Sequence, residues 1–252
     1  MSALLEVSNL NKHFGGLHAV KNVSFSVEPG EVVGILGPNG AGKTTLYNLL
    51  TGFIVPDAGS RVVFKGQSVL GIAPHRIAGL GISRTFQLCR PFIGMSVLEN
   101  VIVGALGSKR EHGADLDKLA QSLLKRVGLA GKEQIPVEVL SYGDQRRLEI
   151  ARALAAKPAL LLLDEPFAGL GSAEIGDLSA LIKQVHVDEG LTVLLIEHKL
   201  REFMRLVDRV IALDFGEVIA EGSPEDIVKH PAVIEAYIGR GNTVDAEPTH
   251  AA

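Results

Sequence analysis

The chain has 252 residues, of which 46% are hydrophobic, and a formal net charge of −4, so it can bury a sizeable core and is not predominantly disordered. This charge provides no general basic surface for a nucleic-acid backbone, and nucleic acid is therefore not an expected partner. The single cysteine, Cys89, cannot form an intramolecular disulfide, and the sequence shows neither a signal-peptide pattern nor an apolar run of ~18 residues, which predicts a soluble cytosolic chain.

The first predicted elements are strands. Alternating apolar and polar residues at 23–27 predict a half-buried strand, and the continuous apolar run Val32–Leu36 predicts a strand that is covered on both faces. Three further apolar runs of this kind lie at residues 159–163, 191–196 and 210–213. Segments with helical spacing separate the runs, such as the apolar face over residues 175–185 that ends before Gly190. This alternation predicts an α/β fold with a parallel sheet.

The middle of the chain has a different pattern, because strand signals become rare there. Ser96 and Glu99 have the spacing of a capping box and predict a helix through Leu106. Apolar spacing predicts a second helix over residues 116–127, with Gly128 as its stop. We therefore expect a helical subdomain in this part of the chain.

These patterns predict the domain organisation. The helical subdomain, at about residues 88–157, is expected to be inserted into a single domain that spans residues 1–239. The remaining segment, residues 240–252, is polar and has no periodicity, so we expect a disordered tail.

A phosphate-binding motif follows the predicted strand Val32–Leu36. Residues 37–44, GPNGAGKT, satisfy the P-loop pattern G-x-x-x-x-G-K-[ST] and precede an apolar helix. In such a loop, backbone NH groups and the helix N-terminus point at phosphate oxygens, Lys43 reaches the β- and γ-phosphates, and the Thr44 hydroxyl is a Mg²⁺ ligand. The alternative is an ordinary glycine-rich turn. The residues expected to contact nucleotide here are Asn39, Gly40, Ala41, Gly42, Lys43, Thr44 and Thr45.

Two carboxylates end the apolar run at 159–163. A P-loop site needs a second Mg²⁺ anchor at the end of a neighbouring buried strand, and Asp164 is in the position to be that ligand, directly or through water. Glu165 comes next and is the candidate general base that activates or orients the attacking water. The alternative is a solvated turn before Pro166.

A further motif indicates the family. Residues 140–144, LSYGD, resemble the LSGGQ signature of ABC-type ATPases, and Ser141 stands 23 positions before Asp164, as that family requires. The resemblance covers nearly the whole chain and implies ATP and Mg²⁺ as cofactors. It also implies a P-loop NTPase (RecA-like) core with an antiparallel β subdomain and an inserted helical subdomain.

By position, the resemblance assigns three further site residues. Phe14 matches the aromatic residue that stacks on adenine, and His198 matches the switch histidine at the γ-phosphate. Gln87 matches the Q-loop glutamine. The resemblance implies two roles for Gln87: it is a catalytic residue together with Glu165 and His198, and it is also a metal ligand.

The resemblance implies that catalysis needs two ATPase subunits, in a homodimer or a heterodimer. Ser141 and Gly143 precede a segment with helical spacing, so in one subunit they are expected to face the γ-phosphate bound to the other. Two residues depart from the family pattern, because Asp144 replaces the usual Gln of the signature and Gly171 replaces the usual Asp or Asn of the following loop. These departures are expected to weaken the shared site.

Among ABC proteins, the sequence favours a transporter subunit. Lys43 and Ser141 are only 98 positions apart, which leaves no room for the long coiled coil of chromosome-maintenance relatives, and a single P-loop argues against the tandem translation factors. The group it resembles most is that of branched-chain (hydrophobic) amino-acid uptake. The motifs behind this are FGGL at 14–17, RTFQ at 84–87, PF at 91–92, MSVLEN at 95–100, LSYG at 140–143 and AYIG at 236–239.

Three alternative functions remain open: an ATPase for urea uptake, an ATPase for lipopolysaccharide export, and a nucleotide-binding assembly subunit that scarcely hydrolyses ATP.

The resemblance implies transmembrane permease subunits as partners and, indirectly, a periplasmic solute-binding protein. It places the chain peripherally on the cytoplasmic face of the inner membrane. A cytoplasmic permease helix is expected to dock near Gln87, at the apolar segment 88–97; the alternative is that this segment packs inside the subdomain.

Overall fold

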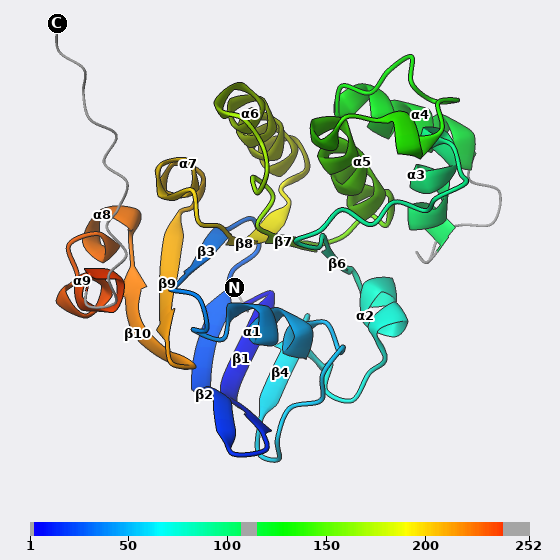
Figure 1. Ribbon diagram of the computed structural model, residues 1–252. Coiled ribbons are helices and arrows are strands. Elements are labelled where there is room, and N and C mark those ends of the chain that lie inside the picture. The colour runs from blue at the N-terminus through cyan, green and yellow to red at the C-terminus, as the bar shows by residue number, and fades with distance from the viewer. Residues whose placement is uncertain (1–2, 107–114, 239–252) are drawn as a thin grey trace, which may run out of the picture.

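Two β-sheets organise residues 3–106 and 115–238, which the computed structural model describes (Figure 1). The predicted tail at 240–252 lies outside the described residues. Within the described part, no helix combines the length and the apolar character needed to cross a bilayer.

The larger sheet is the α/β core that the apolar runs predict. Three of its parallel strands, β3, β8 and β7, are buried at every position, because helices or the second sheet cover both faces. β10 alone runs antiparallel, in a hairpin with β9. In spatial order the strands are β10 (Glu217–Gly222), β9 (Arg209–Asp214), β3 (Val32–Leu36), β8 (Thr192–Ile196), β7 (Leu160–Asp164) and β6 (Ile82–Arg84).

The smaller sheet is the antiparallel β subdomain. The alternation that predicts a strand at 23–27 lies in the second half of β2, where Val23, Phe25 and Val27 are buried and the serines between them are exposed. The buried face of this sheet shares one hydrophobic cluster with the core sheet and with α1 (Lys43–Leu50), which packs between them. Its strands, in order, are β2 (Leu17–Val27), β1 (Leu5–Phe14), β4 (Arg61–Phe64) and β5 (Gln67–Ser68).

Helices cover the opposite face of the core sheet. The predicted helix over 175–185 is the middle of α6 (Ser172–Glu189), and Gly190 ends it in a left-handed conformation, as predicted. α7 (Leu200–Leu206) packs so closely that a Cβ on Gly34 of β3 would lie 2.2 Å from the ring of Phe203. The remaining helices outside the helical subdomain are α2 (Pro74–Leu80), α8 (Pro224–Ile227) and α9 (Pro231–Ile238).

The inserted helical subdomain projects from one end of the core sheet (Figure 1). The capping box that predicts its first helix is present, because the backbone NH of Ser96 donates to Glu99 at 2.7 Å and that of Glu99 donates to Ser96 at 3.2 Å. The second predicted helix is also confirmed, and a positive φ at Gly128 follows its end. Its helices are α3 (Val97–Leu106), α4 (Leu116–Arg126), the short 3₁₀ turn η1 (Val137–Val139) and α5 (Tyr142–Ala155).

Candidate nucleotide-binding site

The P-loop connects β3 to α1, and it contains two glycines at which a side chain would collide with neighbouring backbone. A Cβ on Gly37 would lie 2.4 Å from the carbonyl oxygen of Leu213, and one on Gly42 would lie 2.6 Å from that of Ala19. Gly42 also has a φ of +100°, a left-handed conformation that L side chains rarely adopt. The loop therefore packs tightly against β2 and β9, and α1 starts at Lys43, within the motif.

The side chain of Lys43 is buried beneath this loop. Its Nζ donates to the carbonyl oxygens of Gly37 at 2.7 Å and Pro38 at 3.0 Å. Burial lowers the pKa of the Lys43 ammonium, and the carboxylates of Glu165 and Asp164 oppose that shift. An ammonium and a helix N-terminus at one point make this an anion-binding site.

A cavity of about 710 Å³ lies over the P-loop, within the usual size of ligand pockets. It contains every residue predicted to bind the nucleotide within one chain, and also Gln87 and Glu165. Phe14 stands at its edge and is 44% exposed, as a ring available for stacking should be. The lining residues are Phe14, Leu17, His18, Ala19, Lys21, Asn39, Gly40, Ala41, Gly42, Lys43, Thr44, Thr45, Gln87, Glu165 and Phe215.

Three residues predicted to be catalytic meet at one carboxylate. Glu165 follows β7 with a φ of +49°, an uncommon conformation for a residue other than glycine and one that often marks functional sites. The amide Nε2 of Gln87 donates to Glu165 Oε2 at 2.8 Å, and Nε2 of His198 lies 2.9 Å from Glu165 Oε1. Segments that follow β6, β7 and β8 thus place Gln87, Glu165 and His198 in direct contact.

Asp164 is buried beside this group and is 3% exposed. Burial raises the pKa of the Asp164 carboxyl, and the guanidinium of Arg84, at 2.7 Å, opposes that shift. Mg²⁺ prefers hard oxygen ligands and takes only one or two carboxylates, with phosphate oxygens completing its shell. The carboxylate of Asp164, the hydroxyl of Thr44 and the amide oxygen of Gln87 fit this ion, and the described residues contain no cluster of three His, Cys, Asp or Glu side chains that would suit another metal.

Sequence reasoning missed two charged residues that support the site, Arg84 and Glu197. Glu197 is 2% exposed, and its carboxylate accepts from the backbone NH groups of Phe167 at 2.7 Å, His198 at 2.6 Å and Lys199 at 2.9 Å. It therefore holds together the loops after β7 and β8. The available signal was a charged residue directly after a buried strand, which has to find partners.

The signature residues Ser141 and Gly143 lie outside the P-loop cavity. Ser141 is the N-cap of α5, and its hydroxyl accepts from the backbone NH of Asp144 at 3.2 Å. Ser141 and Gly143 line a separate small pocket, so one chain does not bring them to the P-loop cavity. The two departures from the family pattern have local partners, because Asp144 forms an ion pair with Lys132 and the backbone NH of Gly171 donates to Glu174 at 3.0 Å.

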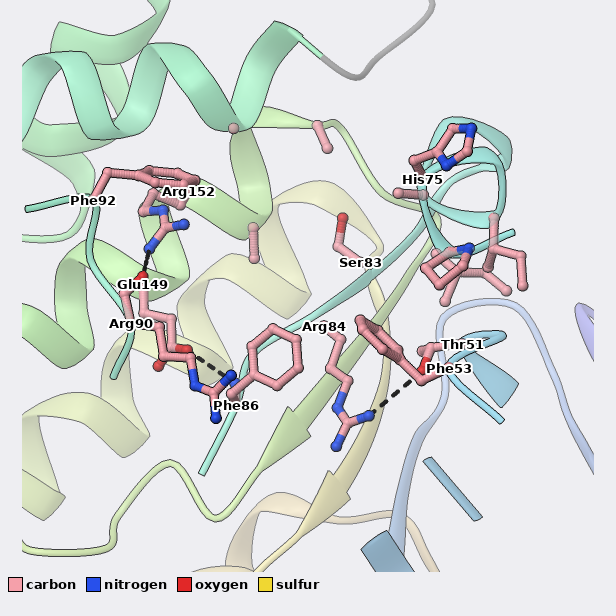
Figure 2. Close-up of a pocket in the computed structure, with 17 residues that line it drawn as sticks. Thr51, Phe53, His75, Ser83, Arg84, Phe86, Arg90, Phe92, Glu149 and Arg152 are labelled. Carbon is pink, nitrogen blue, oxygen red and sulfur yellow. Dashed lines mark hydrogen bonds between the residues drawn. The ribbon is translucent and has the colours of Figure 1, made fainter. Parts of the chain in front are cut away.

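A second large cavity, of about 450 Å³, lies between the core and the helical subdomain (Figure 2). We call it the docking groove, after the expectation that a permease helix docks near Gln87; it is lined by Thr51, Phe53, Pro74, His75, Ile77, Ala78, Ile82, Ser83, Arg84, Phe86, Arg90, Phe92, Gly104, Glu149, Arg152, Ala153 and Ala156. Phe92, Ile93 and Met95 are 41%, 70% and 38% exposed, so these apolar side chains lie at the surface, while Phe92 also contacts Arg152 of the subdomain. Burial raises the pKa of the Cys89 thiol to about 11, which makes a reactive thiolate unfavourable.

Comparison with known proteins adds the family. Residues 20–168 match the ABC transporter family, and residues 217–242 match the family described as branched-chain amino acid ATP-binding cassette transporter. The high-affinity branched-chain amino acid transport ATP-binding protein LivG of Escherichia coli K12 is 41% identical, over 94% of this chain and 98% of LivG. The protein of the same description, BraF, from Pseudomonas aeruginosa is 40% identical, over 94% and 98%.

Solved structures agree with these sequence matches. The ADP conformation of MJ1267, an ATP-binding cassette of an ABC transporter, superposes with a TM-score of 0.85 at 32% identity, over 95% of this chain and all of that one. The dimeric structure of MJ0796, a bacterial ABC transporter cassette, has a TM-score of 0.78 at 28% identity, over 87% and 98%. Fold, P-loop and nearly full-length matches agree, and the chain belongs to the ABC transporter family as an ATP-binding cassette.

Proposed function

We propose that this chain is the ATP-hydrolysing subunit of a membrane ABC transporter that imports branched-chain or other hydrophobic amino acids. The observation that carries the hydrolytic part is the contact of Glu165 with both Gln87 and His198 at the P-loop cavity. The solute is inferred from LivG and BraF and from the match at residues 217–242. We assign this function to one domain, residues 1–239, with residues 88–157 as its inserted helical part.

The proposed chemistry uses groups that are already in place. The P-loop NH groups, the α1 N-terminus and Lys43 bind the phosphates of ATP, and Phe14 stacks on the adenine. Thr44, Asp164 and Gln87 would hold Mg²⁺, which supplies positive charge to the phosphate oxygens. Glu165 accepts the proton of the attacking water, and His198 holds that carboxylate and contacts the γ-phosphate.

We further propose that a second ATPase subunit, identical or different, completes each site. Its Ser141 and Gly143 would present the N-terminus of α5 to the γ-phosphate. Two observations support this: the signature residues lie in a pocket separate from the P-loop cavity, and a relative of this fold forms dimers. Hydrolysis would remove the phosphate that links the subunits, and the opening of the dimer would drive transport.

The docking groove is the proposed contact with the permease. It combines exposed apolar side chains such as Phe92 with the cations of Arg90 and Arg152, a composition suited to a short amphipathic helix that carries acidic groups. This contact would place the subunit peripherally at the cytoplasmic face of the inner membrane, and the solute-binding protein would act on it only through the permease. Charge reversal at Arg90 should then impair assembly with the permease while ATP binding is retained.

Glu165→Gln tests the proposed function. It removes the proton acceptor but keeps the size of the side chain, so we expect at least about 100-fold slower ATP turnover. Light scattering on the purified variant with Mg²⁺ and ATP should show a dimer that persists, whereas the wild-type dimer disappears as ATP is consumed. Equal, negligible turnover in both proteins and no ATP-dependent dimer would contradict an ATPase that is active as a dimer of this chain alone, and would point to an obligate partner ATPase or to an assembly subunit.

A further inference from the structure

Arg84, the last residue of β6, has a side chain that is only 6% exposed and makes two strong hydrogen bonds. Nη2 donates to Asp164 Oδ2 at 2.7 Å, and Nη1 donates to Asn48 Oδ1 at 2.6 Å. A planar guanidinium can serve two such acceptors at once, in a geometry that a lysine ammonium does not reproduce. Arg84 therefore links the end of β7 to the side of α1.

This link lies next to two of the proposed metal ligands, Asp164 and Thr44. Thr44 and Asn48 are four residues apart in α1, so they lie on one face of the helix and one turn apart. Arg84 thus holds Asp164 itself and the residue one turn below Thr44. These two bonds therefore bridge the elements that carry the two proposed metal ligands.

Two aromatic rings hold the guanidinium. Its Cζ lies 5.0 Å from the ring centroid of Phe86 and 5.5 Å from that of Tyr47, in cation–π contact. Figure 2 shows Arg84 next to Phe86, with its guanidinium directed toward Thr51. The rings of Phe86 and Phe53 pack edge to face, 5.9 Å apart, and both line the docking groove. The position of Arg84 is thus set partly by the wall of that groove.

We infer that Arg84 is a positioning residue that holds the Asp164 carboxylate in the orientation for Mg²⁺ and connects it to the wall of the docking groove. It engages one oxygen, Oδ2, and no residue in the described part of the chain donates a hydrogen bond to the other, Oδ1. That oxygen is therefore available to a metal or its water. The inference rests on the proposed Mg²⁺–ATP site and extends it to a residue outside the cavity.

The experiment is nucleotide binding by the purified full chain, followed with a fluorescent ATP analogue at increasing Mg²⁺ and, separately, in EDTA. In the wild type, Mg²⁺ should tighten binding. Arg84→Met should raise the Mg²⁺ concentration of half-maximal effect about tenfold, the usual cost of losing a partner of a metal ligand. Affinity in EDTA should stay unchanged, because Arg84 does not line the nucleotide cavity. Arg84→Lys keeps the charge but loses one bond, so its shift should be smaller.

Arg209→Met is the matched control. Arg209 is the first residue of β9, and its Nε lies 2.7 Å from Oε1 of Glu31. The variant therefore removes another arginine–carboxylate pair of the same sheet. This variant should leave the Mg²⁺ requirement unchanged. An unchanged requirement in Arg84→Met, or equal weakening in EDTA and in Mg²⁺, would overturn the inference. If Arg84→Met does not fold, an unchanged Mg²⁺ requirement in Arg84→Lys overturns the inference. If Mg²⁺ does not affect nucleotide binding by the wild type, the proposed function itself is overturned.

Discussion

The P-loop edge of the core sheet and the N-terminus of α5 carry the two halves of the proposed site, and they differ in how complete they are. At the sheet edge, Glu165 is bonded to Gln87 and His198, and Lys43 is buried under the loop. At α5, Ser141 is exposed, and within the described residues its hydroxyl accepts only from the backbone NH of Asp144 in its own helical turn. One half is assembled by the fold of a single chain, and the other is presented outward for a second subunit.

A mixing experiment tests this comparison with the largest expected effect. Lys43→Ala removes the phosphate-binding ammonium, and Ser141→Arg blocks the N-terminus of α5, so each variant alone should lack measurable ATP turnover. In a mixed dimer, one site combines an intact P-loop with an intact signature. Turnover should therefore reappear when the two purified variants are combined.

The control for mixing is the double variant Lys43→Ala/Ser141→Arg, which cannot contribute an intact half and should restore nothing when combined with either single variant. Failure of the two single variants to complement each other, while both still fold by circular dichroism, would show that the halves do not act across a dimer of two copies of this chain.

Arg146 connects the two regions, and its removal should have the next largest effect. Its side chain is 2% exposed and donates to the carbonyl of Phe86 at 2.9 Å, to that of Gln87, to the Tyr142 hydroxyl at 2.8 Å and to Glu149 at 3.2 Å. Arg146→Met removes the ion-pair partner of the buried Glu149, so we expect the free energy of unfolding in urea to fall by about 3 kcal/mol.

The neighbouring residue provides the control for this variant. Arg147 pairs with Asp177, whose side chain is 72% exposed, so Arg147→Met should cost less than about 1 kcal/mol in the same unfolding experiment. Equal losses in the two variants would mean that the buried network adds nothing to what a surface ion pair contributes.

The smallest effect is expected at the departure from the signature pattern. Lys132 neutralises the carboxylate of Asp144, and solvent reaches both side chains in part, so Asp144→Gln should change ATP turnover by no more than about twofold. Lys132→Met should be the more harmful substitution, because it leaves a carboxylate unpaired near the bound phosphate. A large gain of turnover in Asp144→Gln would show that this residue does weaken the shared site.

Local sequence patterns were sufficient to predict features that lie within a single strand or helix. The buried strands, the capping box at Ser96 and the stop of α6 at Gly190 all follow from spacing and were confirmed. β1 was missed because its register shifts between Val7 and Leu10 and again after it, which breaks the alternation of apolar and polar residues. β6 was missed because three residues are too few for a period to show.

By itself, the sequence determined the phosphate-binding loop and the strand that ends in Asp164 and Glu165, because a P-loop is defined by glycines and a lysine at fixed spacing along the chain. Only the tertiary structure decided which side chains meet there. Gln87, Glu165 and His198 are far apart in sequence and touch because parallel strands end at one edge of the sheet. The pairing of β6 with β7 also buries Arg84 against Asp164, and the spacing of these two residues along the chain does not predict that contact.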